Sequence, residues 1–128
     1  MAFTAKLGAH VQNLGEHQPV VFDTVQTNIG GAYASDTGVF SAPADGVYYF
    51  SATIMCQYGD YIETEIIHNG NHVVYIYASD NNGHEQGTNS VVLELLEGDH
   101  VWVRNINTTG DKIYGNDWST FTGFRLSY

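Results

Sequence analysis

Turn-forming residues recur at short intervals along the chain and leave only strand-length segments between them. Clusters of Asn, Asp, Gly and Pro lie at 28–31, 36–38, 43–46, 59–60, 69–70, 80–83, 97–99, 110–111 and 116–117. The intervening segments are rich in Val, Ile, Tyr, Phe and Thr, and none sustains the apolar spacing of an amphipathic helix. Short strands at this spacing predict an all-β sandwich.

The segment 47–58 shows the clearest alternation of apolar and polar residues. Alternate side chains of a strand point to opposite faces, so one face of this segment is predicted to be core. That face carries Tyr48, Phe50, Ala52, Ile54, Cys56 and Tyr58. Cys56 is the only cysteine, which excludes an intrachain disulfide, and we expect it to act as a small buried hydrophobe.

Two hairpins and a closing strand follow from the same signals. The segments 90–96 and 101–103 flank the turn at 97–99, and the segments 62–66 and 73–77 flank Asn69-Gly70, a pair typical of a two-residue hairpin turn. The run 121–128 is predicted to end the chain inside a sheet. With no repeat or linker, we expect residues 1–128 to form a single domain.

The charge of the chain argues against two classes of partner. Asp and Glu number 14 against four Lys and Arg, which gives a formal net charge of −10. Bare nucleic acid and anionic membranes would be repelled at long range. No segment approaches the roughly 18 apolar residues of a membrane span, so membrane insertion is not expected. Residues 1–4 lack the features of a signal peptide, so localisation has to come from resemblance.

The spacing of seven residues resembles the signature of the C1q globular head. These residues are Phe22, Asn28, Tyr33, Phe40, Gly46, Tyr48 and Phe50, and the similarity extends over essentially the whole chain. The signature usually has an aromatic residue where this chain has Ala52, for which we expect local repacking within the same fold. The resemblance implies a ten-stranded jelly-roll β-sandwich of the C1q and tumour necrosis factor (TNF) type.

The same resemblance implies a secreted, extracellular homotrimer that recognises ligands with its exposed loops. Many relatives carry a collagen-like stalk before the head; we expect this chain to be an excised head or a stalkless form of invertebrate type. The residues argue for a trimer independently, because apolar side chains fall on the outward strand faces, where exposure usually marks an interface. These are Tyr49, Met55, Val92, Leu96 and Trp102.

A polar stretch at 80–85 is the candidate calcium site. It offers carboxylates, amide carbonyls and a Gly-containing backbone, which are the ligands that calcium takes, and several C1q-like heads bind calcium through a corresponding loop. Asp80 and Glu85 are the expected carboxylate ligands. Because Asn, Asp and Gly are also ordinary turn formers, the alternative is a plain loop, and no cofactor is certain.

Other polar groups have simpler interpretations. His68 and His72 flank the turn at Asn69-Gly70, and with no third ligand in the pattern we expect exposed turn histidines rather than a metal site. Glu63 and Glu65 alternate on one strand and are expected to form a solvated edge. Asn107 begins an N-glycosylation sequon, which is consistent with secretion.

Aromatic and polar residues near strand ends are the candidate ligand-binding residues. Sugar recognition needs aromatic faces for the apolar patches of the ring and planar polar groups for its hydroxyls. The candidates are Tyr58, Asp60, Tyr61, Tyr114, Asn116, Asp117 and Trp118. The alternative is that many of these aromatic residues belong to the core or to a subunit interface.

The sequence therefore predicts a recognition protein and not an enzyme. It contains no Gly-x-Ser-x-Gly, P-loop, dinucleotide-binding or His-Glu-x-x-His motif. We expect a trimeric, lectin-like pattern-recognition protein of innate immunity that binds carbohydrate or microbial surface ligands. The alternative is a trimeric signalling or scaffolding ligand of the C1q and TNF type that binds a protein receptor.

Overall fold

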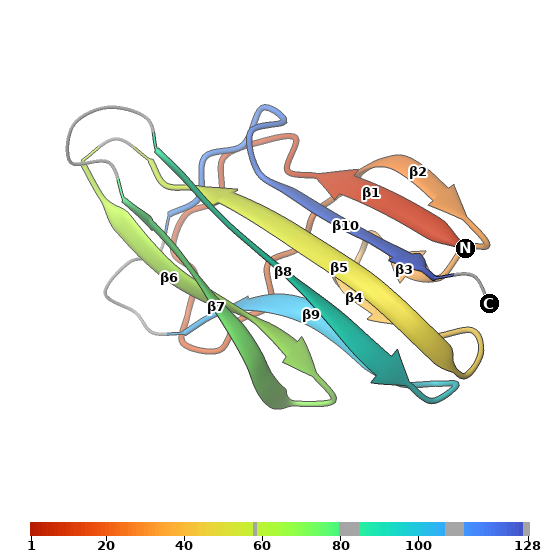
Figure 1. Ribbon diagram of the computed structural model, residues 1–128. Coiled ribbons are helices and arrows are strands. Elements are labelled where there is room, and N and C mark those ends of the chain that lie inside the picture. Colours follow the sequence, from red (N-terminus) through yellow and green to blue (C-terminus); the bar gives the residue numbers. More distant parts are fainter. Residues whose placement is uncertain (58, 80–84, 107–111, 127–128) are drawn as a thin grey trace.

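Ten β-strands form two five-stranded antiparallel sheets in the computed structural model, which describes residues 1–57, 59–79, 85–106 and 112–126 (Figure 1). The first sheet has the order β2-β1-β10-β5-β8, and the second has the order β3-β4-β9-β6-β7. The strands are β1 (Ala2–Lys6), β2 (Thr24–Ile29), β3 (Tyr33–Ala34), β4 (Val39–Ser41), β5 (Gly46–Met55), β6 (Tyr61–His68), β7 (Asn71–Ser79), β8 (Gln86–Leu95), β9 (His100–Asn105) and β10 (Thr120–Arg125). Among the described residues there is no helix long and apolar enough to cross a membrane.

The last strand lies in the middle of the first sheet. β10 pairs with β1 on one side and with β5 on the other, so that Thr4, Thr122 and Ser51 stand in one row. Neighbours that are distant in sequence are typical of a jelly roll. The predicted all-β jelly roll is therefore confirmed. Its first and last strands, β1 and β10, are neighbours in the first sheet.

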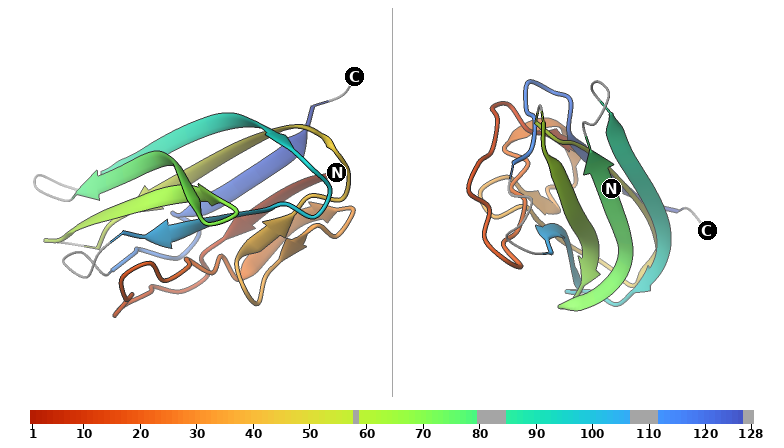
Figure 2. Two further views of the ribbon diagram at one scale, coloured as in Figure 1. Left: turned by 90° about the horizontal axis from the view of Figure 1, so that it is seen from below. Right: turned by 90° about the vertical axis from the view of Figure 1, so that its left-hand side faces the viewer.

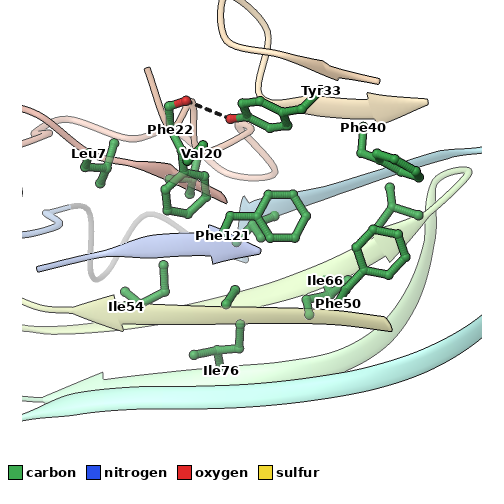
Figure 3. Packing of buried hydrophobic residues seen from close by; sticks show 14 of the residues in the cluster. Leu7, Val20, Phe22, Tyr33, Phe40, Phe50, Ile54, Ile66, Ile76 and Phe121 are labelled. Atoms are coloured by element: carbon green, nitrogen blue, oxygen red, sulfur yellow. Dashed lines mark hydrogen bonds between the residues drawn. The ribbon is translucent and has the colours of Figure 1, made fainter. Parts of the chain in front are cut away.

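The core lies between the two sheets, and β5 supplies much of it. Tyr48, Phe50, Ala52 and Ile54 of β5 are buried, as is Cys56 just after the strand, and their alternation predicts this. The side chains that point inward from β5 meet those of the opposite sheet (Figure 3).

Aromatic rings fill the end of the core near β3 and β4. Phe3 stacks on Tyr33 with ring centroids 4.8 Å apart and meets Phe121 edge to face at 5.1 Å. The buried Tyr33 hydroxyl donates a hydrogen bond of 2.8 Å to the carbonyl of Phe22 (Figure 3). Burial raises the pKa of Tyr33 well above its usual range, so this hydroxyl stays a donor.

The two sheets come together along the side formed by β7 and β8 (Figure 2). The side-chain amide of Asn89 donates a hydrogen bond of 3.0 Å to the carbonyl of Tyr75 across this seam. Gly87 allows the approach, because a Cβ at this position would overlap the carbonyl oxygen of Tyr77. A glycine is therefore required here by close backbone contact.

The β6–β7 turn has the backbone that its sequence predicts, with φ of 50° at Asn69 and 88° at Gly70. It is joined to the β8–β9 turn through Asp99. This carboxylate accepts hydrogen bonds from the side-chain amide of Asn69 at 3.0 Å and from the backbone amide of Leu96 at 3.0 Å, and it lies 2.9 Å from Nε2 of His68. These bonds, led by that of Asn69, lower the pKa of Asp99 to about 2.

The expectation of a solvated edge at Glu63 and Glu65 is wrong for Glu65, which is buried. Its carboxylate accepts a hydrogen bond from Nε of Arg104 and also lies 2.8 Å from Nδ1 of His72. His72 itself is exposed, whereas His68 is half-buried against Asp99. The two turn histidines thus contact different carboxylates.

An apolar row crosses the outward face of the first sheet. Phe124 pairs with Tyr49, which pairs with Val92, and the rings of Phe124 and Tyr49 lie 5.1 Å apart. Val92 is 57% exposed and Phe124 is 37% exposed, so this face offers apolar surface, as the alternation predicts. Met55, expected on the same face, is instead buried.

Candidate ligand-binding site at the loop end of the sandwich

Most of the residues singled out from the sequence fall at one end of the sandwich. β5 ends there and β6 begins there, and β7 ends where β8 begins (Figure 1). The segment between β9 and β10 returns through the same end. The topology therefore brings the described residues at these strand ends to the same end of the sandwich.

A cavity of about 280 Å³ opens at this end. It is lined by Met55 from the end of β5, Gln86 from the start of β8, and Tyr114 and Trp118 from the segment before β10. Trp118 is 52% exposed, which is high for a large aromatic side chain. The structure thus brings together two predicted site residues, Tyr114 and Trp118.

Backbone and side-chain hydrogen bonds fix the shape of this cavity. The Gln86 side-chain amide donates 2.8 Å to the carbonyl of Trp118, and the backbone amide of Tyr114 donates 2.7 Å to the carbonyl of Met55. The buried Ser119 hydroxyl donates to the carbonyl of Tyr114 and accepts from the backbone amide of Met55. The walls are thus held before any ligand arrives, which lowers the entropic cost of binding.

Asn116 and Asp117 form the turn between the two aromatic residues. Both have left-handed backbones, with φ of 52° and 71°, which Asn and Asp tolerate better than most residues. Their backbone amides donate to the carbonyls of Gly8 and Leu7. The Asp117 carboxylate lies 3.4 Å from Nζ of Lys6. Both side chains are exposed at the loop end, but neither lines the cavity.

Asp60 and Tyr61 belong to a different surface. The Asp60 carboxylate accepts a hydrogen bond of 2.8 Å from the backbone amide of Tyr61, and the Tyr61 ring lies 6.1 Å from that of Tyr77 on the second sheet. Tyr77 is 56% exposed. The structure does not place this pair on the cavity, and Tyr58 lies outside the described residues.

Only one of the two predicted calcium ligands lies among the described residues. Asp80 lies outside the described residues, and Glu85 is exposed just before β8. In the described ranges, no group of three or more His, Cys, Asp or Glu side chains could hold a metal ion. Asp80 and Glu85 therefore stay a prediction, as does the sequon at Asn107, which also lies outside the described residues.

Two of the four residues that line the cavity, Met55 and Gln86, are not among the binding residues predicted from the sequence. Met55 was expected on an outward face, but the segment around Tyr114 folds over it and buries it. Gln86 follows the polar stretch at 80–85 directly, and this position at the start of a predicted strand was the available signal. The result is an aromatic and thioether wall with one amide, a combination that can stack on an apolar ring and bond a hydroxyl group.

Comparison with known proteins identifies the family. Residues 2–126 match the model of the C1q domain. The heavy metal-binding protein HIP of Mytilus edulis is 40% identical, with 98% of this chain and 60% of that protein covered. Human complement C1q tumor necrosis factor-related protein 3 is 37% identical, with 98% of this chain and 51% of that protein covered. The chain thus spans only about half to three-fifths of these relatives.

Solved structures show the same fold. The globular domain of zebrafish complement 1qA protein superposes with a TM-score of 0.80 at 22% identity, covering 98% of this chain and 97% of that one. The Eiger TNF of S. frugiperda superposes with a TM-score of 0.79 at 15% identity, covering 99% and 92%. At these identities the likeness establishes the jelly roll alone.

Proposed function

Because the chain belongs to the C1q domain family, we propose that it is a secreted, trimeric recognition protein that binds carbohydrate or other microbial surface ligands. The single observation that carries the proposal is the cavity at the loop end, where the half-exposed Trp118 stands beside Tyr114 and Gln86. No catalytic role is assigned to any residue.

The chemistry of this cavity fits a sugar ring. An exposed indole offers a flat apolar face for the C–H patch of a pyranose, and the phenol of Tyr114 and the amide of Gln86 supply hydrogen-bonding groups. The volume of about 280 Å³ is close to the lower end of the usual range for small-molecule sites. We therefore assign the cavity to one terminal sugar residue.

The apolar row on the first sheet supports the trimer. The exposed side chains of Phe124 and Val92 flank the half-buried Tyr49 on one sheet face, and together they form the kind of apolar surface that a subunit interface covers. A trimer carries three copies of the loop-end cavity. Weak sites gain roughly two to four orders of magnitude in avidity when a multivalent surface engages several of them.

A glycan array tests the proposal directly. The wild-type protein is expected to give a restricted set of positive sugars, and Trp118→Ala is expected to lose them. Tyr75→Ala is the matched control, because Tyr75 is also a highly exposed aromatic residue but lies on the second sheet, away from the cavity. The array is run with and without calcium, which also tests the predicted ligands Asp80 and Glu85. No signal in either condition would refute sugar binding.

A signalling or scaffolding ligand is the second candidate function. Tyr75 and Tyr77 are 61% and 56% exposed on the outward face of β7, and exposed tyrosines are common in protein-binding surfaces. In this case the flank of the trimer would bind a protein receptor. Capture of cell-surface proteins that is lost in Tyr75→Ala and kept in Trp118→Ala would favour it over sugar recognition.

A further inference from the structure

A second groove lies on the outward face of the second sheet, on the opposite side of the core from the apolar row. Its volume is about 410 Å³, larger than that of the loop-end cavity. Trp102 stands at the middle of the β9 residues that line it, between His100 and Arg104. The lining residues are His17, Pro19, Thr37, Val39, His100, Trp102 and Arg104.

The groove exists because two different segments share one edge of β9. β4 pairs with β9 only at His100 and Val101. Toward the end of β9 the segment 17–20 lies along the same edge, with Pro19 opposite Arg104. Val20 donates 2.8 Å to the carbonyl of Val103, and Asn105 donates 3.0 Å to the carbonyl of Gln18. Trp102 therefore lies where neither neighbour covers the strand fully, and it is left half-buried.

The polar groups of this groove are a guanidinium, two imidazoles and the neutral hydroxyl of Thr37. Arg104, His17 and His100 line it, and no Asp or Glu does so. This is unusual in a chain with a formal net charge of −10, in which Arg104 is one of only four Lys and Arg residues. Without a carboxylate in its lining, the groove offers hydrogen-bond donors to an anion and no ligand to a cation.

A hydrogen bond to Glu65, which does not line the groove, fixes the orientation of the Arg104 guanidinium. Its Nε donates a hydrogen bond of 2.8 Å to the buried carboxylate of Glu65, and no other hydrogen bond of this guanidinium is present in the described part of the chain. The terminal N–H groups are consequently left for a ligand. A planar guanidinium of fixed orientation suits a carboxylate, which it can bind with two parallel hydrogen bonds.

We propose that this groove binds a small aromatic or alicyclic carboxylate, with the ring of the ligand against Trp102 and the carboxylate on Arg104. The site is separate from the sugar site proposed above and does not depend on it. The residues that would hold the ligand, Trp102 and Arg104, both belong to β9.

The two tryptophans of the chain make the test specific, because Trp102 lies in this groove and Trp118 in the loop-end cavity. In Trp118→Phe the single remaining indole N–H resonance belongs to Trp102. The variant is titrated with 1-naphthoate, and in parallel with the uncharged 1-naphthamide, which has nearly the same shape. We expect a saturable shift with naphthoate and binding weaker by about tenfold or more with the amide, the discrimination that charge-assisted hydrogen bonds give.

A charge-removing variant completes the experiment. Arg104→Gln alone would leave Glu65 buried without its cation, so Arg104→Gln is combined with Glu65→Gln, and folding is checked by circular dichroism. We expect naphthoate and naphthamide to bind this double variant equally. Glu63→Gln, also on β6, is the matched control and should keep the preference for naphthoate. Absence of a shift of the Trp102 resonance, or equal binding of both probes before Arg104 is removed, would overturn the proposal.

Discussion

The Glu65 carboxylate accepts a hydrogen bond of 2.8 Å from Nε of Arg104, and the two residues are direct partners across β6 and β9. Glu65 is only 4% exposed, although its strand faces outward at this position. Neighbouring side chains cover it: Tyr75 is its partner on β7, and the ring of His72 stacks on that of Tyr75 at 3.9 Å. A buried carboxylate is stable here because a cation accompanies it.

Replacing Arg104 alone should therefore lower the free energy of unfolding much more than replacing both Arg104 and Glu65. Arg104→Met leaves the Glu65 carboxylate buried with only His72 beside it, and we expect the free energy of unfolding to fall by roughly 3 kcal/mol. The double variant Arg104→Met with Glu65→Leu should recover most of this loss. Urea denaturation monitored by circular dichroism measures both, and equal stabilities of the single and double variants would contradict the expectation.

Asp99 should make the protein sensitive to acid. Its pKa is lowered from 3.8 to about 2 by hydrogen bonds from Asn69, His68 and Leu96. A depressed pKa stabilises the folded state fully above the unfolded value, and this contribution is lost as the pH falls from 3.8 to about 2. In Asp99→Asn the urea midpoint should fall less over this window than in the wild-type protein. Asp36→Asn, a change at an exposed carboxylate, is the control and should behave like the wild type.

Gly87 should not accept a side chain. A Cβ there would overlap the carbonyl oxygen of Tyr77, and backbone at the seam between the sheets cannot move aside as a flexible side chain can. We expect Gly87→Ala to lower the free energy of unfolding by roughly 1–3 kcal/mol. Gly15→Ala is the matched control, since its Cβ would meet only the Gln18 side chain at 3.5 Å. Thermal melts of the two variants should differ by several degrees.

The apolar row of the first sheet should govern assembly. Phe124→Asp places a charge beside Tyr49 on the face that we assign to the subunit interface. Since Phe124 is 37% exposed in the isolated chain, the variant should fold but sediment as a monomer in analytical ultracentrifugation. Tyr77 is an aromatic residue on the second sheet and is more exposed than Phe124, so Tyr77→Asp should keep the assembly state of the wild type. An unchanged mass for Phe124→Asp would refute this assignment of the interface.

The fold was predictable because its signals are local. The alternation from Tyr48 to Cys56 identifies a core strand from side-chain direction alone, and Asn69-Gly70 specifies its turn through backbone preference. Neither depends on which strand lies beside which. The same holds for the aromatic core residues Phe22, Tyr33 and Phe40 of the family signature, which are all buried.

The sites were less predictable because they depend on pairing between distant segments. Glu65 looks like a surface residue until β9 brings Arg104 beside it, 39 residues away. Met55 likewise becomes buried only when the segment around Tyr114 crosses the end of β5. The aromatic residues of the cavity were predicted from type and position near strand ends, but their neighbours required the sheet order.

The central place of β10 has a consequence for biosynthesis. Until Thr120 to Arg125 have left the ribosome, β1 and β5 have no strand between them. Without β10, the first sheet can form only as two separate pairs of strands, β2 with β1 and β5 with β8. The hydroxyls of Thr4 and Thr122 lie 3.0 Å apart in the folded protein. Thr122, however, is synthesised 118 residues after Thr4. Both β1 and β5 therefore keep one edge without a partner strand until the last strand is synthesised, and unpaired strand edges favour aggregation.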